Sequence, residues 1–161
     1  MTGDDFWMRE CLALAREAAV QDEIPIGAVV VRDGEVIGRG RNRREETGDP
    51  TAHAEILALR EAGERLQCWR LENCNLYVTI EPCVMCAGAV VWSRIRRLVF
   101  GARDTKAGAV ASLYQIPQDE RLNHRVEVVE GVLADECAAI MKEFFDSLRS
   151  GPAFEAKNDT T

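Results

Sequence analysis

The sequence predicts an α/β domain with a central mixed sheet, and two observations carry that prediction. Strand-like segments alternate along the chain with segments of helical periodicity. An early pair of strand-like segments is joined by Asp33-Gly34, which suits a tight hairpin turn and makes the sheet mixed rather than wholly parallel. A chain of 161 residues, 47% hydrophobic, has room for one core. We therefore expect one domain over 1–161, with 150–161 as a disordered tail.

The first half of the chain is expected to hold two helices on either side of the hairpin. Residues 4–21 form the first helix, because apolar side chains recur there at helical spacing. These residues are Phe6, Trp7, Cys11, Leu14, Ala15 and Ala18. The hairpin occupies 27–38 and the polar stretch 42–50 is a loop. The second helix starts near Pro50 or Thr51, capped by Asp49 or Thr51, and runs to about Ala62.

The second half is expected to continue the alternation. Residues 75–80 form a strand, Pro82 opens a helix that ends near Ser93, and 97–102 form the next strand. The mixed stretch 103–124 precedes a short strand within 125–132. A closing helix covers 135–149. Its apolar side consists of Ala138, Met141, Phe144, Phe145 and Leu148.

The composition indicates a cytoplasmic protein without a membrane partner. No apolar run approaches the length of a membrane span, and the acidic start of the chain lacks the basic and apolar regions of a signal peptide. A reducing compartment is then expected, so the six cysteines should be thiols or metal ligands rather than disulfides.

The net charge of −7 does not by itself indicate a nucleic-acid partner. The local distribution is more favourable, because cations gather in two segments. They are Arg94, Arg96, Arg97, Arg103 and Lys106 in one, and Arg39, Arg41, Arg43 and Arg44 in the other. Such clusters are usually solvated surface, although they are compatible with contacts to phosphate.

The strongest chemical signal is His53-Ala54-Glu55 followed by Pro82-Cys83-Val84-Met85-Cys86. Two cysteines three residues apart at a helix start lie on one side of its first turn, where the helix dipole favours thiolates. His53 supplies a third ligand, which leaves the fourth tetrahedral position for water, as in catalytic zinc sites. We expect one zinc ion per chain, which makes hydroxide available near neutral pH.

Glu55 is expected to be the proton carrier of this site. It lies two residues beyond His53, so it points aside from the ligand yet stays close to the bound water. A carboxylate there takes a proton from the water and returns it to the ring nitrogen and the departing ammonia.

Each part of this signal has a simpler explanation when it stands alone. A Cys-x-x-Cys pair is also found as buried thiols or as a redox pair, and a single histidine is usually structural. The combination, in this order and with Pro82 before the first cysteine, is far more specific. The remaining cysteines, which we interpret as buried or incidental, are Cys11, Cys68, Cys74 and Cys137.

The motif resembles that of the cytidine deaminase superfamily, and neighbouring segments are similar to the bacterial tRNA-specific adenosine deaminases. The similarity extends from about Phe6 to Arg149. The segments that carry it are Asp49-Pro-Thr-Ala-His-Ala-Glu-Ile, Glu81-Pro-Cys-Val-Met-Cys-Ala-Gly-Ala, Phe100-Gly-Ala-Arg-Asp, Asn123-His-Arg-Val-Glu and Leu133-Ala-Asp-Glu-Cys-Ala.

The resemblance implies a three-layer α/β/α cytidine-deaminase-like fold and conversion of adenosine to inosine at the wobble position of a tRNA anticodon, usually of an arginine tRNA. It also implies a homodimer. By similarity, Asn42 would hydrogen-bond the flipped base of the anticodon stem-loop, and Ile26 with Ala54 would wall the pocket. The residues that would contact the substrate strand near the base are Asp104, Lys106 and Asn123.

Three alternatives remain open from the sequence. A free nucleobase or nucleoside deaminase of the same superfamily, acting on guanine or cytosine, would share all the metal ligands. A non-enzymatic zinc module should have four protein ligands and no need for Glu55. The helix after Pro82 is apolar nearly all round, which favours a homodimer but also suits a central core helix.

Overall fold

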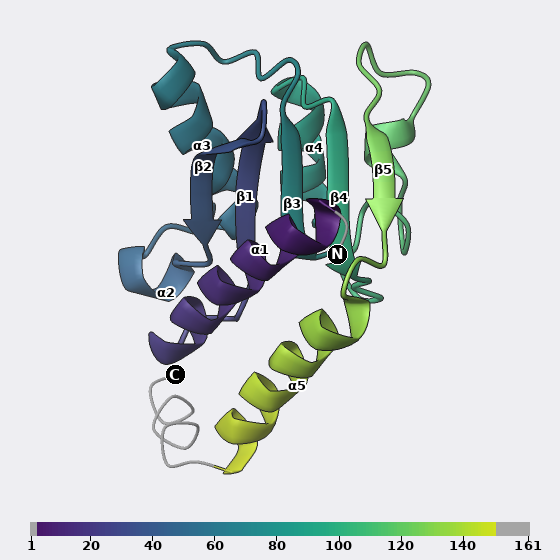
Figure 1. The fold of residues 1–161 in the computed structure, drawn as a ribbon. Coiled ribbons are helices and arrows are strands. Elements are labelled where there is room, and N and C mark those ends of the chain that lie inside the picture. The colour runs from purple at the N-terminus through teal and green to yellow at the C-terminus, as the bar shows by residue number, and fades with distance from the viewer. Residues whose placement is uncertain (1–2, 151–161) are drawn as a thin grey trace.

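The computed structural model describes residues 3–150, which build a five-stranded sheet with helices on both faces (Figure 1). This confirms the predicted three-layer α/β/α arrangement. The helices are α1 (Gly3–Val20), α2 (Arg44–Thr47), α3 (Ala54–Leu66), α4 (Val84–Trp92) and α5 (Ala134–Ser150). The strands are β1 (Gly27–Arg32), β2 (Glu35–Arg41), β3 (Asn75–Ile80), β4 (Arg97–Ala102) and β5 (Glu127–Glu130).

The sheet is mixed, as predicted, and its strands lie in the order β2-β1-β3-β4-β5. β1 runs antiparallel to both β2 and β3, whereas β3, β4 and β5 are parallel to one another. The carboxyl ends of β3 and β4 therefore meet at one edge, which is where α/β folds commonly place their ligands.

Alternate residues of the central strands feed two hydrophobic cores. Val30 and Val78 belong to the core under α3 and α4, whereas Val29 and Val99 belong to the core under α1 and α5. This alternation follows from the two-residue period of a strand, and it lets each strand hold a helix layer on either face. Figure 1 shows α1 and α5 on the near face of the sheet and α3 and α4 behind it.

The β1–β2 hairpin forms as predicted. Its two turn residues, Asp33 and Gly34, have φ values of 51° and 73°, the left-handed pair that a tight two-residue turn requires. On β2, Gly40 lies against the backbone of α3 at Ala54 and Ala58, where a Cβ atom would collide. The absent side chain brings the start of α3 close to the sheet.

The second predicted helix begins and ends later than expected. α3 starts at Ala54, with His53 as its N-cap residue, and continues to Leu66. Neither Asp49 nor Thr51 caps it, because the Asp49 Oδ1 atom instead accepts the Thr51 N–H and hydroxyl at 2.8 and 2.7 Å. This local turn holds the chain extended ahead of the helix.

Other boundaries shift by smaller amounts. The predicted loop 42–50 contains the short helix α2, and α4 starts at Val84 rather than at Pro82. The mixed stretch 103–124 includes a 3-10 turn at Ile116–Gln118, and β5 covers only Glu127–Glu130. The strands β3 and β4 match their predicted ranges.

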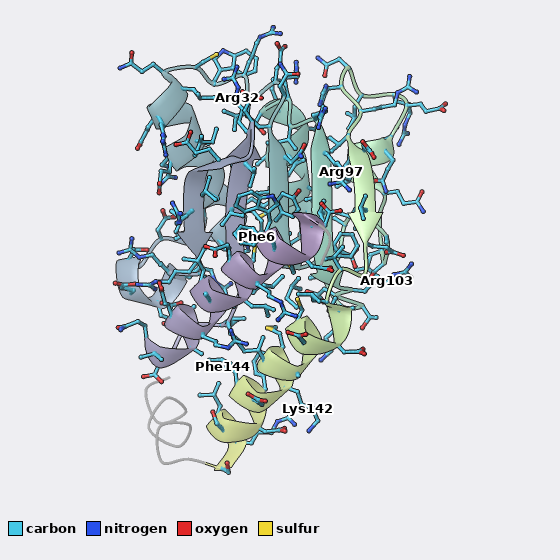
Figure 2. The ribbon with its side chains drawn as sticks, in the orientation of Figure 1. Phe6, Arg32, Arg97, Arg103, Lys142 and Phe144 are labelled. Atoms are coloured by element: carbon cyan, nitrogen blue, oxygen red, sulfur yellow. The ribbon has the colours of Figure 1, made fainter. Side chains whose placement is uncertain are left out.

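The predicted apolar side of the closing helix does not all face the core. Cys137 and Phe144 are the buried residues of α5, and Phe144 lies between α5 and α1 (Figure 2). Ala138 and Phe145 are exposed, the latter by 38%. On α1, Phe6 was expected on the buried face but is 51% exposed.

No helix within residues 3–150 is long and apolar enough to cross a membrane. The expected tail, apart from Ser150 at the end of α5, lies outside the described residues.

Candidate active site

Two helix starts converge behind the sheet and bring the predicted metal ligands together. His53 is the N-cap residue of α3 and Cys83 is the N-cap residue of α4, both with extended backbone (ψ of 152° and 178°). Cys86 lies in the first turn of α4 and is fully buried. One donor atom from each residue falls within a group whose members are all within 4.8 Å of one another.

The separations between these donor atoms suit a tetrahedral metal ion. The Nδ1 atom of His53 lies 3.6 Å from the Cys83 sulfur and 3.5 Å from the Cys86 sulfur. Tetrahedral angles with the usual zinc–sulfur and zinc–nitrogen bond lengths place such atoms about 3.6 Å apart. The donor set therefore fits zinc with three protein ligands.

The charges of the three side chains depend on one another. A hydrogen bond from the Cys86 thiol lowers the pKa of Cys83 to about 3, and burial opposes this. The same bond, reinforced by burial, raises the pKa of Cys86. The hydrogen bond with Cys83 raises the pKa of His53, while burial and, to a smaller extent, the Arg44 charge oppose this. The site thus holds a thiolate ready to bind a cation.

Glu55 lies beside this cluster as the second residue of α3. Its side chain is only 4% exposed, and burial raises the pKa of its carboxyl to about 7. A carboxyl that titrates near neutral pH can both accept and donate a proton at physiological pH. Its position and its pKa suit the proton-carrying role expected from the sequence.

A cavity of about 550 Å³ opens beside the cluster. It is lined by residues from five separated parts of the chain. They are the segment before β1, the stretch from Asn42 to Glu55, the end of β3, the end of β4 and one face of α5. The predicted site residues that line it are Ile26, Asn42, His53, Ala54, Glu55, Cys83, Asp104 and Lys106. Such a volume lies within the range of small-ligand sites.

Asn42 is held in the cavity wall with one end of its amide in use. Asn42 is 3% exposed, and its backbone N–H donates to the Ile26 carbonyl at 3.2 Å. Its side-chain Oδ1 atom accepts the backbone N–H of Arg44 at 3.3 Å. The Nδ2 group is left to donate to a ligand.

Asp104 and Lys106 lie in the loop after β4. One oxygen of Asp104, Oδ1, accepts the backbone N–H groups of Lys106 and Ala107 at 3.0 and 3.1 Å, so it shapes the loop. Asn123 is exposed and is absent from the cavity lining. The structure thus gathers all the predicted contact residues except Asn123.

Several lining residues were not anticipated from the sequence. Arg44, two residues beyond Asn42, was noted only as part of an arginine cluster. Met141 packs against the core, as predicted, and also lines the cavity, whereas Phe145 is exposed and lines the cavity. Glu81, directly before Pro82, also lines the cavity, and its acidic character beside a metal-ligand motif was the signal available.

Residues 2–149 match the family model described as MafB19-like deaminase. With the fold and the site, this defines the chain as a deaminase of the cytidine-deaminase-like class. It is 48% identical over 158 residues to a tRNA-specific adenosine deaminase of Bacillus subtilis, with 98% of each chain covered. It is 49% identical over 153 residues to that of Haemophilus influenzae, covering 94% of this chain and 88% of the other. The chain belongs to the tRNA-specific adenosine deaminase family.

Solved structures of related deaminases support this family assignment. One from work on A-to-I editing by tRNA:A34 deaminases at the wobble position superposes with a TM-score of 0.81 and 47% identity, covering 84% of this chain and 98% of that one. A guanine deaminase from Nitrosomonas europaea superposes with a TM-score of 0.74 and 31% identity, covering 89% of this chain and 85% of that one. The fold is therefore shared by deaminases of different purines.

Proposed function

We propose that this protein deaminates adenosine to inosine at the wobble position of a tRNA anticodon, with an arginine tRNA as substrate. The relatives that share about half of its residues carry the name tRNA-specific adenosine deaminase. The observation that carries the proposal is the buried carboxyl of Glu55 beside a three-donor cluster, at a cavity whose lining includes Arg44 and Lys106. Because tRNA is modified in the cytoplasm of bacteria, we propose that the protein acts there. We also propose that the whole chain is one deaminase domain.

The proposed cofactor is one zinc ion per chain, held by His53, Cys83 and Cys86. Three ligands and the observed donor separations suit a catalytic rather than a structural zinc ion. When bound, zinc supplies a water molecule activated for attack on the purine ring. A four-ligand structural module would not need the buried Glu55.

The chain's own residues handle the protons and the base. Glu55 accepts a proton from the attacking water and delivers protons to the ring nitrogen and to the amino group, which leaves as ammonia. Asn42 donates from Nδ2 to an acceptor on the base edge, and the apolar side chains of Ile26 and Ala54 enclose the ring. The balance is adenosine plus water giving inosine plus ammonia.

The substrate strand would lie across the cavity mouth. We assign Asp104 and Lys106, which line the cavity, to the nucleotides next to the reacting base. Asn123, which is exposed outside the cavity lining, would contact the strand further away. A base in an RNA loop is unstacked at low cost, so an anticodon loop suits this arrangement.

We also propose a homodimer that uses the outer faces of α3 and α4. α4 buries one side, including Val90, but leaves Val84 and Trp92 exposed by 52% and 71%. Beside Trp92 is an open groove of about 700 Å³, lined also by Trp69, which is 57% exposed. Exposed aromatic residues over a groove are typical of protein interfaces rather than of free surface.

The test offers the protein an arginine tRNA stem-loop with adenosine at the wobble position. Its controls are the same loop with a different base there, free adenosine, free cytidine and free guanine. Inosine is expected only in the first, detected by nuclease digestion and chromatography of the nucleosides. Similarity to a guanine deaminase makes guanine the informative competitor. Faster release of ammonia from guanine or cytidine than from the stem-loop would overturn the proposal.

A further inference from the structure

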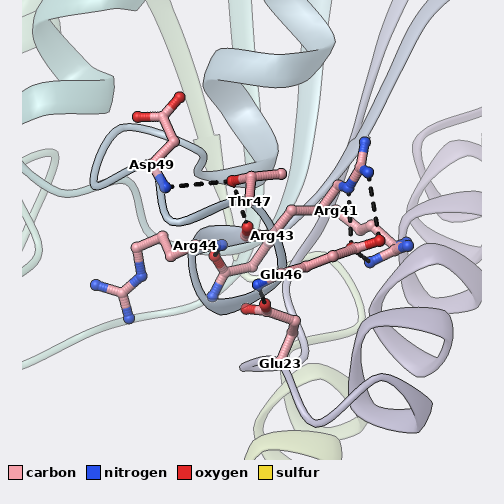
Figure 3. A network of polar contacts seen from close by, with 8 residues as sticks. Glu23, Arg41, Arg43, Arg44, Glu46, Thr47 and Asp49 are labelled. Atoms are coloured by element: carbon pink, nitrogen blue, oxygen red, sulfur yellow. Dashed lines mark hydrogen bonds and ion pairs between the residues drawn. The ribbon is translucent and has the colours of Figure 1, made fainter.

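The arginines around α2 do not share one environment. Arg41 and Arg43 both pair with the carboxylate of Glu46, at nitrogen–oxygen distances of 3.2 and 3.0 Å, so both have an anionic partner inside the segment (Figure 3). The Arg44 side chain points away from this cluster in the same view. Among residues 3–150 it forms no ion pair, and it lines the active-site cavity together with His53.

The backbone of Arg44 nevertheless has a defined position, because several hydrogen bonds anchor α2. The backbone N–H of Glu46 donates to the carboxylate of Glu23 at 2.6 Å, and Glu23 is only 1% exposed. The hydroxyl of Thr47 donates to the carbonyl of Arg43 at 2.7 Å. The N–H of Arg44 itself donates to Asn42. A fixed backbone lowers the entropy cost of presenting this guanidinium to a ligand.

Within residues 3–150, no acidic side chain that lines the cavity forms an ion pair with Arg44. The Glu81 carboxylate is occupied by backbone donors of the 104–112 loop, and one Asp104 oxygen is used by its own turn. Arg103, a second lining cation, pairs with Glu130 at 2.7 Å. Arg44 and Lys106 are therefore the lining cations that make no ion pair within the described part of the chain.

We propose that Arg44 binds a backbone phosphate of the nucleic-acid strand next to the base held in the cavity. The inference rests on the proposed function and narrows it, because a free nucleobase has no phosphate for an unpaired guanidinium. Arginine suits this ligand, since its planar fork of N–H groups matches two phosphate oxygens. Arg44 thereby favours a base within a chain over the same base in free form.

The test measures stem-loop binding by fluorescence anisotropy at about six salt concentrations between about 50 and about 200 mM. Binding is measured in a Glu55→Ala background so that no turnover occurs. Arg44→Ala should weaken binding about tenfold at low salt. It should also make the negative slope of log affinity against log salt shallower by about 0.7, the value for one contact to a single strand. Arg44→Lys should keep the slope but recover only part of the affinity.

The matched control is Arg65→Ala. Arg65 is in the last turn of α3, at the opposite end from His53, and its partner is Glu35 at 2.6 Å. Its removal should leave both the affinity and the slope unchanged. Equal slopes for Arg44→Ala and the parent protein, or an equal effect of Arg65→Ala, would overturn the proposal.

A second arm locates the contact with stem-loops in which single phosphates are replaced by neutral methylphosphonates. One replacement near the wobble base should weaken binding to the parent protein and have no added effect in Arg44→Ala. Additive losses at every position would overturn the proposal. Deamination by the otherwise unmodified protein is scored separately. An Arg44-dependent slope without inosine formation would contradict the proposed function and leave the phosphate site standing.

Discussion

Ser112 gives two hydrogen bonds to the buried carboxylate of Glu81. Its backbone N–H donates to Oε2 at 2.9 Å and its hydroxyl to Oε1 at 2.5 Å. The N–H groups of Val110 and Ala111 also donate to Oε2, at 3.1 and 2.8 Å, and that of Asp104 donates to Oε1 at 3.0 Å. One carboxylate thus ties the loop that carries Asp104 and Lys106 to the segment just before Cys83.

Glu81→Gln is expected to destabilise this loop more than its small change in shape suggests. Burial alone raises the pKa of Glu81, yet the hydrogen bonds from Ser112 and its neighbours outweigh burial and lower it, so the folded state holds the charged form. An amide nitrogen facing N–H donors would leave buried donors unpaired, at a cost of about 3 kcal/mol. Urea unfolding measures this cost.

Ser112→Ala is the control for that substitution, because it removes one hydroxyl bond to the carboxylate and should cost only about 1.5 kcal/mol. Equal unfolding free energies for the two variants would show that the carboxylate does not organise the loop.

Metal content is expected to follow the three-donor cluster. The purified protein should hold about one zinc per chain, and Cys83→Ala or His53→Ala should lose it because two ligands bind zinc weakly. Cys68→Ala is the control, since Cys68 is an exposed cysteine outside the cluster. Elemental analysis gives the ratio. A fully active protein without metal would refute the zinc assignment.

Glu55→Gln and Glu55→Ala should retain zinc and the fold while losing at least about 10⁴-fold in kcat, because one carboxyl carries several proton transfers. Unfolding free energy should stay the same or rise, because burial raises the pKa of Glu55 to about 7 and so disfavours its charged form in the folded state. Kinetics, metal analysis and urea unfolding are compared on the same preparations. Loss of zinc or near-normal turnover would exclude the assigned role.

Trp92→Glu is expected to convert a dimer into a monomer in light scattering at micromolar concentration. A charge placed in an apolar contact is desolvated without a partner, which costs several kcal/mol of association. Val20→Glu serves as control, because Val20 is 79% exposed at the end of α1, in the layer on the other face of the sheet. A monomeric parent protein, or an unchanged mass for Trp92→Glu, would argue against this interface.

The pair between Asp4 and Arg97 predicts part of the acid sensitivity. Arg97 donates two hydrogen bonds to Asp4, at 2.8 and 2.7 Å, and the Tyr77 hydroxyl adds one at 3.0 Å. Arg97 lies on β4 beside α1 (Figure 2). These bonds, that of Arg97 foremost, hold the pKa of Asp4 below its ordinary value of 3.8.

Because the folded-state pKa is the lower one, this stabilisation is present above pH 3.8 and is lost as the pH falls through the folded value. Asp4→Asn should cost about 1–2 kcal/mol at pH 7, and the difference from the parent should shrink below pH 4. Urea unfolding across this pH range measures it. A difference that does not change with pH would contradict the charge-based explanation.

The local sequence alone determined the central strands, the hairpin and the identity of the residues in the cluster. The strands 75–80 and 97–102 match their predicted ranges, because continuous apolar runs between turn residues define a buried strand without reference to the rest of the chain. The hairpin followed from Asp33-Gly34 for the same reason. The order His53, Glu55, Cys83 and Cys86 likewise identified three donors that the structure brings together at two helix starts, and a carboxyl that lines the same cavity.

Only the tertiary structure decided what surrounds that cluster. The late start of α3 depends on a turn made by Asp49, which competes with helix propensity. The cavity combines segments from five parts of the chain, so it includes Arg44 and Phe145 and leaves Asn123 outside its lining. No local pattern encodes these placements, because they follow from how α2, α5 and the loop after β4 pack around the sheet edge, where long-range contacts outweigh propensity.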